Sequence, residues 1–545
     1  MTSVDPGVAP GTADAASLRK DVGEPPPFQR ILIANRGEIA VRIIRAARDL
    51  GMEVVAVYSD ADAHAAHVRM ADEAIRLGPA PATESYLRDD AIVEAALRSG
   101  AQAIHPGYGF LAERASFAHA VEDAGLVFVG PTSSAIAALG DKLAARRLAR
   151  AAGVPVVAGT WEPAPVDRPD EIDAILAEAG SIGLPLLVKA SAGGGGRGMR
   201  RVTRIEELPA ALAAGSSEAR AAFGDGRVYL EREILPARHL EVQLLADAHG
   251  DVVALGERDC SLQRRHQKLV EEAPAPGLSQ EERRRLQAFA VRLGEAANLV
   301  NAATVEFLLD ADRQFAFLEV NTRLQVEHGV TELVSDVDIV REQFRIAAGR
   351  PLSESVRRAA WAAARPSRHA IEVRIAAEDP SRAFSPTPGR ITAWRMPDGP
   401  GVRVDTAVST GERVPPDYDP LIAKVLVVDV DRDGAIDRLR RAIDETEIAG
   451  IQTTLPFHRF LARHAGFRDG DLSTGWVEQE WTPFVGGDRE ASLRLAVQAA
   501  ASHALGTSVV ATSPAPLSLR KDTSSGQGSG WRGAGRQDMT DRWPR

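Results

Sequence analysis

The sequence predicts an α/β protein that begins with a doubly wound parallel sheet and continues into a β-rich, α+β middle region. Three observations predict this class. Short apolar strands alternate with helical segments from residue 28 to about 150, which is typical of a parallel sheet covered by helices. Residues 184–330 change to a pattern of apparent hairpins, and residues 351–480 again contain strands. No internal repeat is visible.

Composition and charge narrow the class of protein further. The chain has 545 residues, of which 44% are apolar and 26% charged, as in a soluble protein of three or four domains. The net charge of −10 disfavours nucleic acid as a partner. The single cysteine, Cys260, excludes an internal disulfide and fits a reducing compartment. No apolar run reaches the roughly 20 residues that span a bilayer. We therefore expect a cytoplasmic protein with no membrane or nucleic-acid partner.

The first domain is expected to start at Phe28, after a flexible extension over residues 1–27. The segment RILIANRGEIAVRIIRAARDLG predicts a strand at Ile31–Ala34, a turn and an amphipathic helix. Further strands are predicted in MEVVAVYSD, AQAIHPGYGF and LVFVGP. The first turn lacks G-x-G-x-x-G, which weakens a nicotinamide-binding interpretation. The segment SSAIAALGDKLAARRLARAAG is predicted to be one helix, followed by a Pro/Asp-rich connection at 162–170.

The C-terminal part shows a second alternation of elements. A helix is predicted in VDIVREQFRIAAG, strands in HAIEVRIAAE, GVRVDTAV and LIAKVLVVDV, and a helix from Asp433 to about Thr446. Residues 481–505 predict a linker-like helix. Residues 506–545 are rich in Ser, Gly, Thr and Pro and are expected to be disordered.

A glycine run, Gly193–Gly196, follows Lys189 closely in a chain that has only six lysines. Two of these lie in the expected flexible ends, so each of the other four could occupy a place that suits a compact ammonium better than guanidinium. Apolar segments on both sides predict a hairpin loop, and no Walker A pattern is present. Backbone N–H groups of such a loop can close over a phosphate. A flexible linker is the alternative interpretation.

A second pattern, TVEFLLDADRQFAFLEVN at 304–321, predicts a hairpin turning at Asp312-Arg313. Cross-strand partners then sum to 625, which places Glu306 opposite Glu319. Facing carboxylates are unfavourable unless a cation joins them, so the pair predicts a Mg²⁺ or Mn²⁺ site, with Asn321 as a further ligand. Two solvated glutamates on an open face are the alternative.

Polar residues continue at every second position from Glu319 to Glu327. An extended chain would place them on one face over at most about 26 Å, with a metal at one end and a base with an anionic substrate at the other. The segment RDCSLQRRHQK, 258–268, is either an exposed basic patch or a source of anion-binding groups on one face, His266 and Lys268. Cys260 is expected to be a small buried residue. In HAIEVRIAAEDP, a structural salt bridge between Arg374 and Glu372 is the simplest interpretation.

Five segments together resemble the biotin carboxylases of the ATP-grasp superfamily: IANRGEIAVRIIRA, HPGYGFLAE, KASAGGGGRGM, ERDCSLQRRHQK and EVNTRLQVEHGVTE. The resemblance runs from about residue 30 to 480. It implies an N-terminal domain over 28–141, an ATP-grasp domain with a glycine-rich lid over 142–350 and a C-terminal biotin carboxylase domain over 351–480.

The resemblance also implies roles for individual residues. The positions that match ATP-binding residues are Lys142, Lys189, Gly193, Gly194, Gly195, Gly196, Glu231, Arg232, Glu233, Ile234, His239, Gln263, His266 and Leu308. Those that match ligands of two Mg²⁺ or Mn²⁺ ions are Glu306, Glu319 and Asn321. Those that match the bicarbonate site are Lys268, Arg323, Gln325, Val326 and Glu327, and Arg374 matches the biotin-binding residue.

The family's chemistry assigns catalysis to Lys268, Arg323, Glu327 and Arg374. ATP activates bicarbonate as carboxyphosphate, Glu327 acts as the base, and Arg374 offsets the charge of the biotin enolate. Four positions depart from the family pattern: Ala192 replaces a usual glycine, Gly329 a usual proline, Ala376 a usual asparagine and Arg232 a common lysine. The first three remove no catalytic group, and at position 232 the backbone is expected to matter more than the charge.

The resemblance further implies partners. The family carries biotin on a lysine within Met-Lys-Met, and none of the six methionines here precedes a lysine. We therefore expect a separate biotin carboxyl carrier protein, a separate carboxyltransferase subunit that selects an acyl-CoA such as acetyl- or propionyl-CoA, and a homodimer. Two alternatives are another ATP-grasp ligase that joins a carboxylate to an amine, and an idle subunit that binds nucleotide and organises a complex.

Overall fold

The structure is a computed structural model that describes residues 25–166, 172–193 and 199–482. The predicted N-terminal extension up to residue 24, the linker-like helix from residue 483, the C-terminal tail and Gly194–Gly196 lie outside these residues. Among the described residues, no helix is both long enough and apolar enough to cross a membrane.

The N-terminal region contains the predicted parallel sheet. Its five strands follow the order β3 (Glu73–Gly78), β2 (Glu53–Ser59), β1 (Arg30–Ile33), β4 (Ala103–His105) and β5 (Val127–Phe128). Its helices are α1 (Gly37–Asp49), α2 (Ala66–Met70), α3 (Asp89–Ser99) and α4 (Ala115–Asp123). The strand in AQAIHPGYGF is shorter than predicted, because the chain turns at Pro106 and at Gly107, whose φ is +64°. The edge strand β3 was not predicted.

The helix predicted in SSAIAALGDKLAARRLARAAG is in fact two helices, α5 (Ser133–Gly140) and α6 (Lys142–Ala151). Asp141 lies between them with extended backbone angles, and its carboxylate accepts a hydrogen bond from the N–H of Ala144 at 3.0 Å. This cap starts α6 at Lys142, because an N-cap carboxylate satisfies a free N–H of the first turn.

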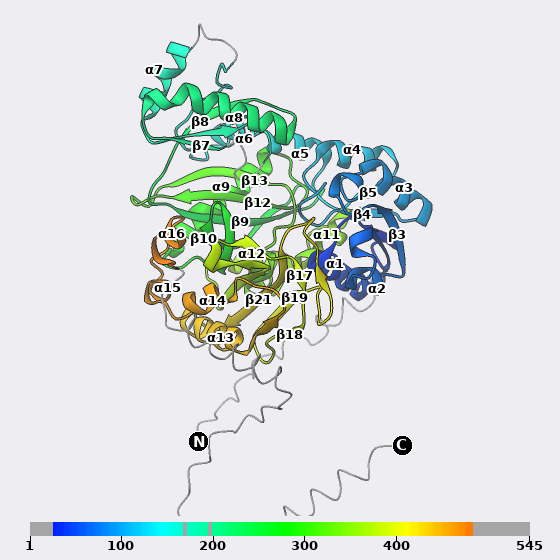
Figure 1. Ribbon diagram of the computed structural model, residues 1–545. Helices are drawn as coiled ribbons and strands as arrows, with labels where there is room; N and C mark the ends of the chain where they lie inside the picture. Colours follow the sequence, from blue (N-terminus) through cyan, green and yellow to red (C-terminus); the bar gives the residue numbers. More distant parts are fainter. Residues whose placement is uncertain (1–24, 167–171, 194–198, 483–545) are drawn as a thin grey trace, which may run out of the picture. The chain divides into compact units, whose positions relative to one another are not determined.

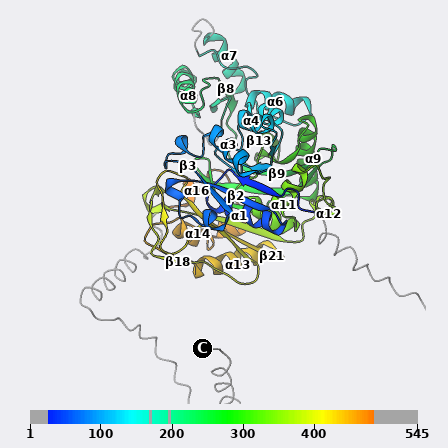
Figure 2. The ribbon, with the colours of Figure 1, turned by 90° about the vertical axis from the view of Figure 1, so that its right-hand side faces the viewer.

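A three-stranded antiparallel sheet carries the glycine loop. Its order is β7 (Arg200–Val202), β6 (Leu186–Ala190) and β8 (Val228–Arg232). The predicted hairpin that the loop joins is therefore confirmed. In Figures 1 and 2, two helices that the sequence did not predict lie beside β8, namely α7 (Ile172–Ile182) and α8 (Leu208–Phe223).

An eight-stranded antiparallel sheet forms the centre of the described chain (Figure 1). Its order is β13 (Phe315–Asn321), β12 (Asn301–Leu309), β9 (Arg238–Ala246), β10 (Val252–Arg264), β11 (Gln267–Ala273), β14 (His369–Ala376), β21 (Leu421–Asp429) and β19 (Val402–Thr406). Strands β11 and β14 pair directly, so this sheet continues across the predicted domain boundary at residue 350.

Helices pack on this sheet from several parts of the chain. They are α9 (Gln280–Ala296), α10 (His328–Ser335), α11 (Ile339–Ala347), α12 (Glu354–Ala362), α13 (Arg432–Glu445), α14 (Leu455–Leu461), α15 (Ala465–Asp469) and α16 (Trp476–Glu480). Three small ladders join β15 (Glu378–Asp379) to β16 (Ser385–Pro386), β17 (Gly389–Arg390) to β20 (Arg413–Val414), and β18 (Ala393–Arg395) to β22 (Glu447–Ala449). The C-terminal strands and the helix after Asp433 agree with prediction, whereas α9 was not predicted.

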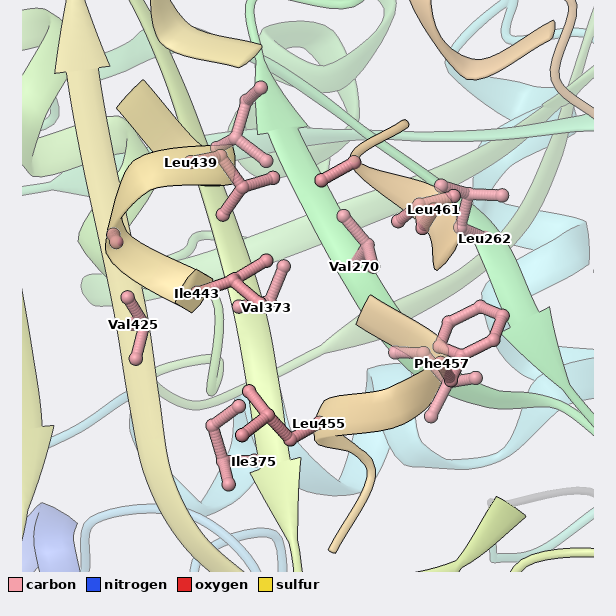
Figure 3. Close-up of a cluster of buried hydrophobic side chains, with 14 of the residues drawn as sticks. Leu262, Val270, Val373, Ile375, Val425, Leu439, Ile443, Leu455, Phe457 and Leu461 are labelled. Carbon is pink, nitrogen blue, oxygen red and sulfur yellow. The ribbon is translucent and has the colours of Figure 1, made fainter. Parts of the chain in front are cut away.

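The apolar core beneath the C-terminal end of this sheet is drawn in Figure 3. Val270, Val373 and Val425 come from three neighbouring strands and are at most 2% exposed. Leu439 and Ile443 of α13 pack against them. Each fully buried side chain of this size contributes about 1.5–3 kcal/mol, so the core fixes the strands whose opposite face carries the charged residues.

Candidate active site

The predicted pair Glu306 and Glu319 belongs to a row of charged residues on successive strands of the eight-stranded sheet, in which Glu241 and Arg258 were not predicted. In cross-strand register, Glu319 on β13 faces Glu306 on β12, Glu306 faces Glu241 on β9, and Glu241 faces Arg258 on β10. Three carboxylates therefore stand in one row across three strands. Like charges directly opposite each other on a ladder repel, so cations must hold this row together.

The predicted pairing of Glu306 with Glu319 is confirmed, although the predicted turn is not. Pairs nearer the turn, such as Phe307 with Phe317, sum to 624, and the ladder shifts register between Glu306 and Phe307. A bulge, which places two residues opposite one, therefore restores the pairing of the two glutamates.

Basic side chains surround the carboxylates of this pair. Lys142 Nζ lies 3.2 Å from Glu319 Oε2, and His239 Nε2 lies 2.9 Å from Glu306 Oε2. Lys268 Nζ donates to Glu306 Oε1 at 3.0 Å. Although burial raises the pKa of Glu306, Lys268 and His239 hold it well below its usual value. Glu306 is therefore an anion in the folded protein.

The donor set fits a hard divalent cation. Asn321 Nδ2 donates to Glu306 Oε1 at 2.9 Å, so the amide lies beside the carboxylate as predicted. Glu319 remains partly exposed, with 27% of its side chain accessible. Two carboxylates and an amide oxygen are ligands that Mg²⁺ and Mn²⁺ prefer.

The chain after Asn321 is not the extended row that the sequence predicted. Strand β13 ends at Asn321, and a turn at Val326 and Glu327 leads into α10. The row is therefore not extended over about 26 Å, and its later residues turn back toward Glu306. Gln325 Nε2 reaches Glu306 Oε1 at 3.2 Å, and Lys268 donates both to Glu306 and, at 2.7 Å, to Glu327 Oε1.

Arg323 is held in place by the N-terminal region. Its Nε donates to Glu113 Oε2 at 2.9 Å, and Glu113 Oε1 also accepts the N–H of Thr322 at 3.1 Å. The two terminal nitrogens of Arg323 donate to Asn321 Oδ1 at 3.0 Å and Gln325 Oε1 at 3.1 Å. Glu113 was not predicted, although it ends the HPGYGFLAE segment.

Glu327 lies between two cations at the start of α10. Its carboxylate is fully buried and accepts hydrogen bonds from Lys268 Nζ at 2.7 Å and from Arg374 Nη2 at 3.0 Å. Burial alone would raise its pKa, but Lys268 and Arg374 bring the pKa well below the usual value. An anion that drew both cations toward itself would reverse this balance, because burial would then dominate.

Arg374 does not form the predicted salt bridge with Glu372. It pairs with Glu271 on β11 and with Glu327. Its backbone carbonyl accepts hydrogen bonds from Thr454 Oγ1 at 2.8 Å and His458 Nε2 at 2.7 Å. Its Nε is buried without a hydrogen-bond partner among the described residues, which is uncommon for a buried donor.

Lys142 connects the glycine run to the carboxylate row, whereas Lys189 is paired within the three-stranded sheet. Lys142 donates to the carbonyl of Gly193, at the start of the glycine run, while also pairing with Glu319. Lys189 pairs with Glu231, whose other oxygen accepts from Arg146 Nη1 at 2.5 Å. Arg146 is fully buried and was not predicted. Gly194, Gly195 and Gly196 lie outside the described residues.

The remaining predicted ATP-binding positions on β9, β10 and β12 lie around His239. His239 faces Leu308 across the β9–β12 ladder, and its Nδ1 lies 3.4 Å from Gln263 Nε2. Although burial lowers the pKa of His239, Glu306 raises it above its usual value. His266 does not share a strand face with Lys268, because it sits in the β10–β11 turn with a φ of +66°. Burial and the positive charge of Lys189 lower the pKa of His266.

The end of β8 lies at the edge of this group. The backbone N–H of Arg232 donates to Ala158, while the side chain is exposed. Glu233 accepts from Arg201 Nε at 2.5 Å, and Ile234 follows outside the strand. The predicted ATP-binding positions therefore extend from β6 and β8 to β9, β10 and β12.

Residues 258–263 of the segment RDCSLQRRHQK are buried, whereas residues 265–267 are exposed where β10 turns into β11. Arg258 is fully buried and donates to Glu241, Gln243 and Thr331. Cys260 is buried as predicted. The many charged residues of the segment give it a hydropathy that is typical of exposed chain. Charges can be buried here because each buried charge is paired across the sheet.

Lys424 on β21 is a further site residue without a predicted role. It is fully buried, and its Nζ donates to the carbonyl of Val326 at 2.8 Å. This contact fixes the turn before Glu327. Its signal was present in the sequence, since Lys424 is one of the four lysines outside the expected flexible ends.

The arrangement can transfer a phosphoryl group to a small anion. Lys142 joins Gly193, at the start of the glycine run, to a carboxylate pair suited to a divalent cation, and Lys268 connects that pair to a buried carboxylate base. Arg374 lies on the other side of the base, and its Nε has no hydrogen-bond partner among the described residues.

Comparison with known proteins matches three family models to successive parts of the chain. Residues 27–136 match the biotin carboxylase N-terminal domain, 141–355 the ATP-binding domain of carbamoyl-phosphate synthase L chain, and 372–479 the biotin carboxylase C-terminal domain.

Individual relatives match over most of their length. The biotin carboxylase of Pseudomonas aeruginosa is 47% identical over 457 residues, which covers 83% of this chain and 98% of that protein. The biotin-dependent acyl-coenzyme A carboxylase alpha3 subunit of Mycobacterium leprae is 47% identical over 464 residues, covering 84% and 76%. The biotin carboxylase domain dimer of Hydrogenobacter thermophilus 2-oxoglutarate carboxylase, solved with MgADP, ADP and bicarbonate, has a TM-score of 0.78 at 43% identity and covers 83% of this chain and 97% of that one.

Proposed function

The chain belongs to the biotin carboxylase family, and we propose that its residues carry out that family's reaction on biotin held by a separate carrier protein, as the first half-reaction of an acyl-CoA carboxylase. One observation carries this proposal. Lys268 contacts Glu306 of the carboxylate pair and Glu327 at the same time, at 3.0 and 2.7 Å. Phosphoryl transfer and proton removal would therefore both take place next to the ammonium group of Lys268.

The nucleotide half of the reaction is assigned to the first group of residues. Lys142, Lys189 and the glycine run would bind the phosphates of ATP, and Glu306, Glu319 and Asn321 would hold Mg²⁺ or Mn²⁺. When bound, the cation neutralises charge on the transferring phosphoryl group. Lys142 pairs with Glu319 and with the carbonyl of Gly193, so it would lie beside both the cation and the start of the glycine run.

Bicarbonate would bind between Lys268 and Arg323, with Gln325 and the backbone of Val326 beside it. As the anion draws Lys268 away from Glu327, the pKa of this buried carboxylate rises and Glu327 can accept the proton of bicarbonate. A bicarbonate oxygen then attacks the γ-phosphorus, ADP leaves, and carboxyphosphate forms. Carboxyphosphate breaks into CO₂ and phosphate.

Arg374 would serve the biotin half of the reaction. Phosphate takes the proton from the ureido nitrogen, Arg374 offsets the negative charge of the enolate, and the nitrogen attacks CO₂. Support for this role comes from the guanidinium, which is anchored through its backbone by Thr454 and His458 but has a buried Nε without a partner among the described residues.

The experiment that tests the proposal measures ADP release with Mg²⁺, with and without bicarbonate and free biotin. Turnover that requires bicarbonate and rises with biotin is expected. Turnover indifferent to both would indicate another ATP-grasp ligase, and tight ATP binding without turnover would indicate an organising subunit. Adding candidate carboxyltransferase subunits with acetyl-CoA, propionyl-CoA or pyruvate then identifies the acceptor, and pyruvate as the best acceptor would overturn the acyl-CoA assignment.

The partner assignments have their own tests. Intact-mass measurement of the purified chain should show no biotin, because biotin would be carried by the separate protein. We also propose a homodimer, since the Hydrogenobacter relative was solved as one. Light scattering that gives the mass of a single chain across micromolar concentrations would overturn the dimer.

A further inference from the structure

Two buried glutamates face each other beside Arg374. Glu271 on β11 and Glu372 on β14 are in direct cross-strand register, and both are fully buried. Side chains paired in this way have Cβ atoms about 4.5–5.5 Å apart. Neither residue is required by the reaction steps described above.

The two carboxylates do not share their cations equally. Among the described residues, Glu271 forms an ion pair with Arg374 and Glu372 forms none, while the oxygens of both carboxyl groups are buried without a hydrogen-bond partner. The charged groups that face Glu372 are Glu271, Arg374 on its own strand, Lys424 on β21 and Glu327 before α10. Lys424 is already engaged by the Val326 carbonyl, and it also lies 3.5 Å from Glu38 and 3.6 Å from Asp405.

The remaining side of Glu372 is closed by backbone. A Cβ built on Gly329 of α10 would lie 3.3 Å from Glu372 Oε2 and 2.4 Å from a methyl group of Leu426. The helix therefore packs directly against the carboxyl group. An ionised carboxylate without a hydrogen bond in such a place costs several kcal/mol, and a second anion opposite it adds to that cost.

We propose that Glu271 and Glu372 form a carboxylic acid pair that retains one proton on Glu372, and that this pair positions Arg374 for the biotin half of the reaction. Only one negative charge of the pair then faces Arg374. The guanidinium can therefore stay paired with Glu327 as well as with Glu271. If both glutamates of the pair were ionised, they would draw the guanidinium toward themselves and away from Glu327. The role in catalysis rests on the proposed function, whereas the protonation of Glu372 does not.

The direction of the pKa shifts supports the pair. Burial raises the pKa of Glu372 well above its usual value, and Glu271 adds to that rise. Burial also raises the pKa of Glu271, to about 7, although Arg374 opposes the rise. Two carboxyl groups this close titrate as a unit, so the pKa at which the first proton leaves is a property of the pair and not of one residue.

Infrared spectroscopy and thermal unfolding test the protonation directly on the full-length protein. Glu372→Gln should remove a protonated-carboxyl C=O band from the wild-type spectrum at neutral pH. It should also raise Tm, because the native state of the wild type keeps a proton that the unfolded chain loses above about pH 4.3, so wild-type stability falls as pH rises. The gain in Tm should therefore be largest near neutral pH and vanish toward about pH 4.

Two variants keep the test falsifiable. Glu272→Gln, on the next residue of β11, removes an ionised carboxylate and should leave the band unchanged while lowering Tm. Glu372→Met, of similar length, should also lose the band if the glutamine variant does not fold. An unchanged band in Glu372→Gln, or a Tm that falls at neutral pH, would overturn the proposal.

The positioning role is tested by the pH profile of biotin-stimulated ADP release. Glu372→Gln should keep kcat within about threefold of wild type, and its alkaline limb for kcat/KM of biotin should move to higher pH, since glutamine cannot ionise. An alkaline limb identical to that of wild type would overturn the positioning role. If wild type shows no bicarbonate-dependent turnover, the proposed function fails, while the infrared and Tm results still decide the protonation.

Discussion

Replacing Glu327 with glutamine gives the sharpest test of how the site works. The side chain is fully buried between Lys268 at 2.7 Å and Arg374 at 3.0 Å. Breaking a buried ion pair by removing one partner usually costs about 3–5 kcal/mol, because a charge is left without a counter-ion. Here Lys268 keeps Glu241 and Glu306, and Arg374 keeps Glu271. We therefore expect a loss of less than about 3 kcal/mol in the free energy of unfolding.

The effect on turnover should be much larger than the effect on stability. A positioned general base contributes about 10²–10⁴-fold, so Glu327→Gln should lose bicarbonate-dependent ADP release by that factor while retaining ATP binding. The matched control is Glu332→Gln on α10, since Glu332 is also buried between two arginines, Arg42 at 2.8 Å and Arg403 at 2.7 Å. It should lose stability and keep kcat. If Glu327→Gln retained turnover within about tenfold of wild type, Glu327 would not be the base.

Three further predictions follow from the charge pairs. Burial opposes the charge on Glu272, but His369 and Arg432 lower its pKa to about 2, so Glu272→Gln should lose about 3 kcal/mol in the free energy of unfolding at neutral pH. In chemical unfolding, the difference from wild type should disappear as pH falls from about 4.5 toward 2, and a pH-independent difference would contradict this prediction. Glu319→Gln should raise the Mg²⁺ concentration for half-maximal ADP release by at least about tenfold, and an unchanged Mg²⁺ titration would exclude it as a ligand. Glu113→Gln, which removes the partly exposed anchor of Arg323, should raise the KM for bicarbonate about 3–10-fold without changing that for ATP, and equal changes in both would argue against the anchor.

Local patterns in the sequence were sufficient for much of the fold. The alternation of apolar strands and helices predicted the parallel sheet, and the hairpin arithmetic predicted the facing pair of Glu306 and Glu319. Helices α8 and α9 were not predicted, because residues 184–330 were interpreted as β-rich throughout and their Ala- and Arg-rich segments were not assigned as helices. Asp141 divided one predicted helix into two, since an aspartate inside a helical pattern can also act as an N-cap.

The site was less accessible to sequence reasoning where it depends on contacts distant along the chain. A regular alternation from Glu319 to Glu327 predicted a strand, but the contact of Lys424 with the carbonyl of Val326 helps to fix a turn there. Glu113 reaches Arg323 across 210 positions, and no local pattern carries that pairing. The residue types therefore indicated the chemistry of the site, whereas the strand pairing in the folded protein determines which side chains contact one another.

The pairing of β11 with β14 has a practical consequence for dividing this protein into fragments. Val270–Ala273 hydrogen-bond to Ala370–Val373, so a fragment that ended near residue 350 would leave the edge of β11 open. Open strand edges recruit strands from other molecules, and the severed half would carry the matching edge. We expect each half expressed alone to aggregate and the two halves expressed together to recombine along this ladder, so a fragment for crystallisation should contain both β11 and β14.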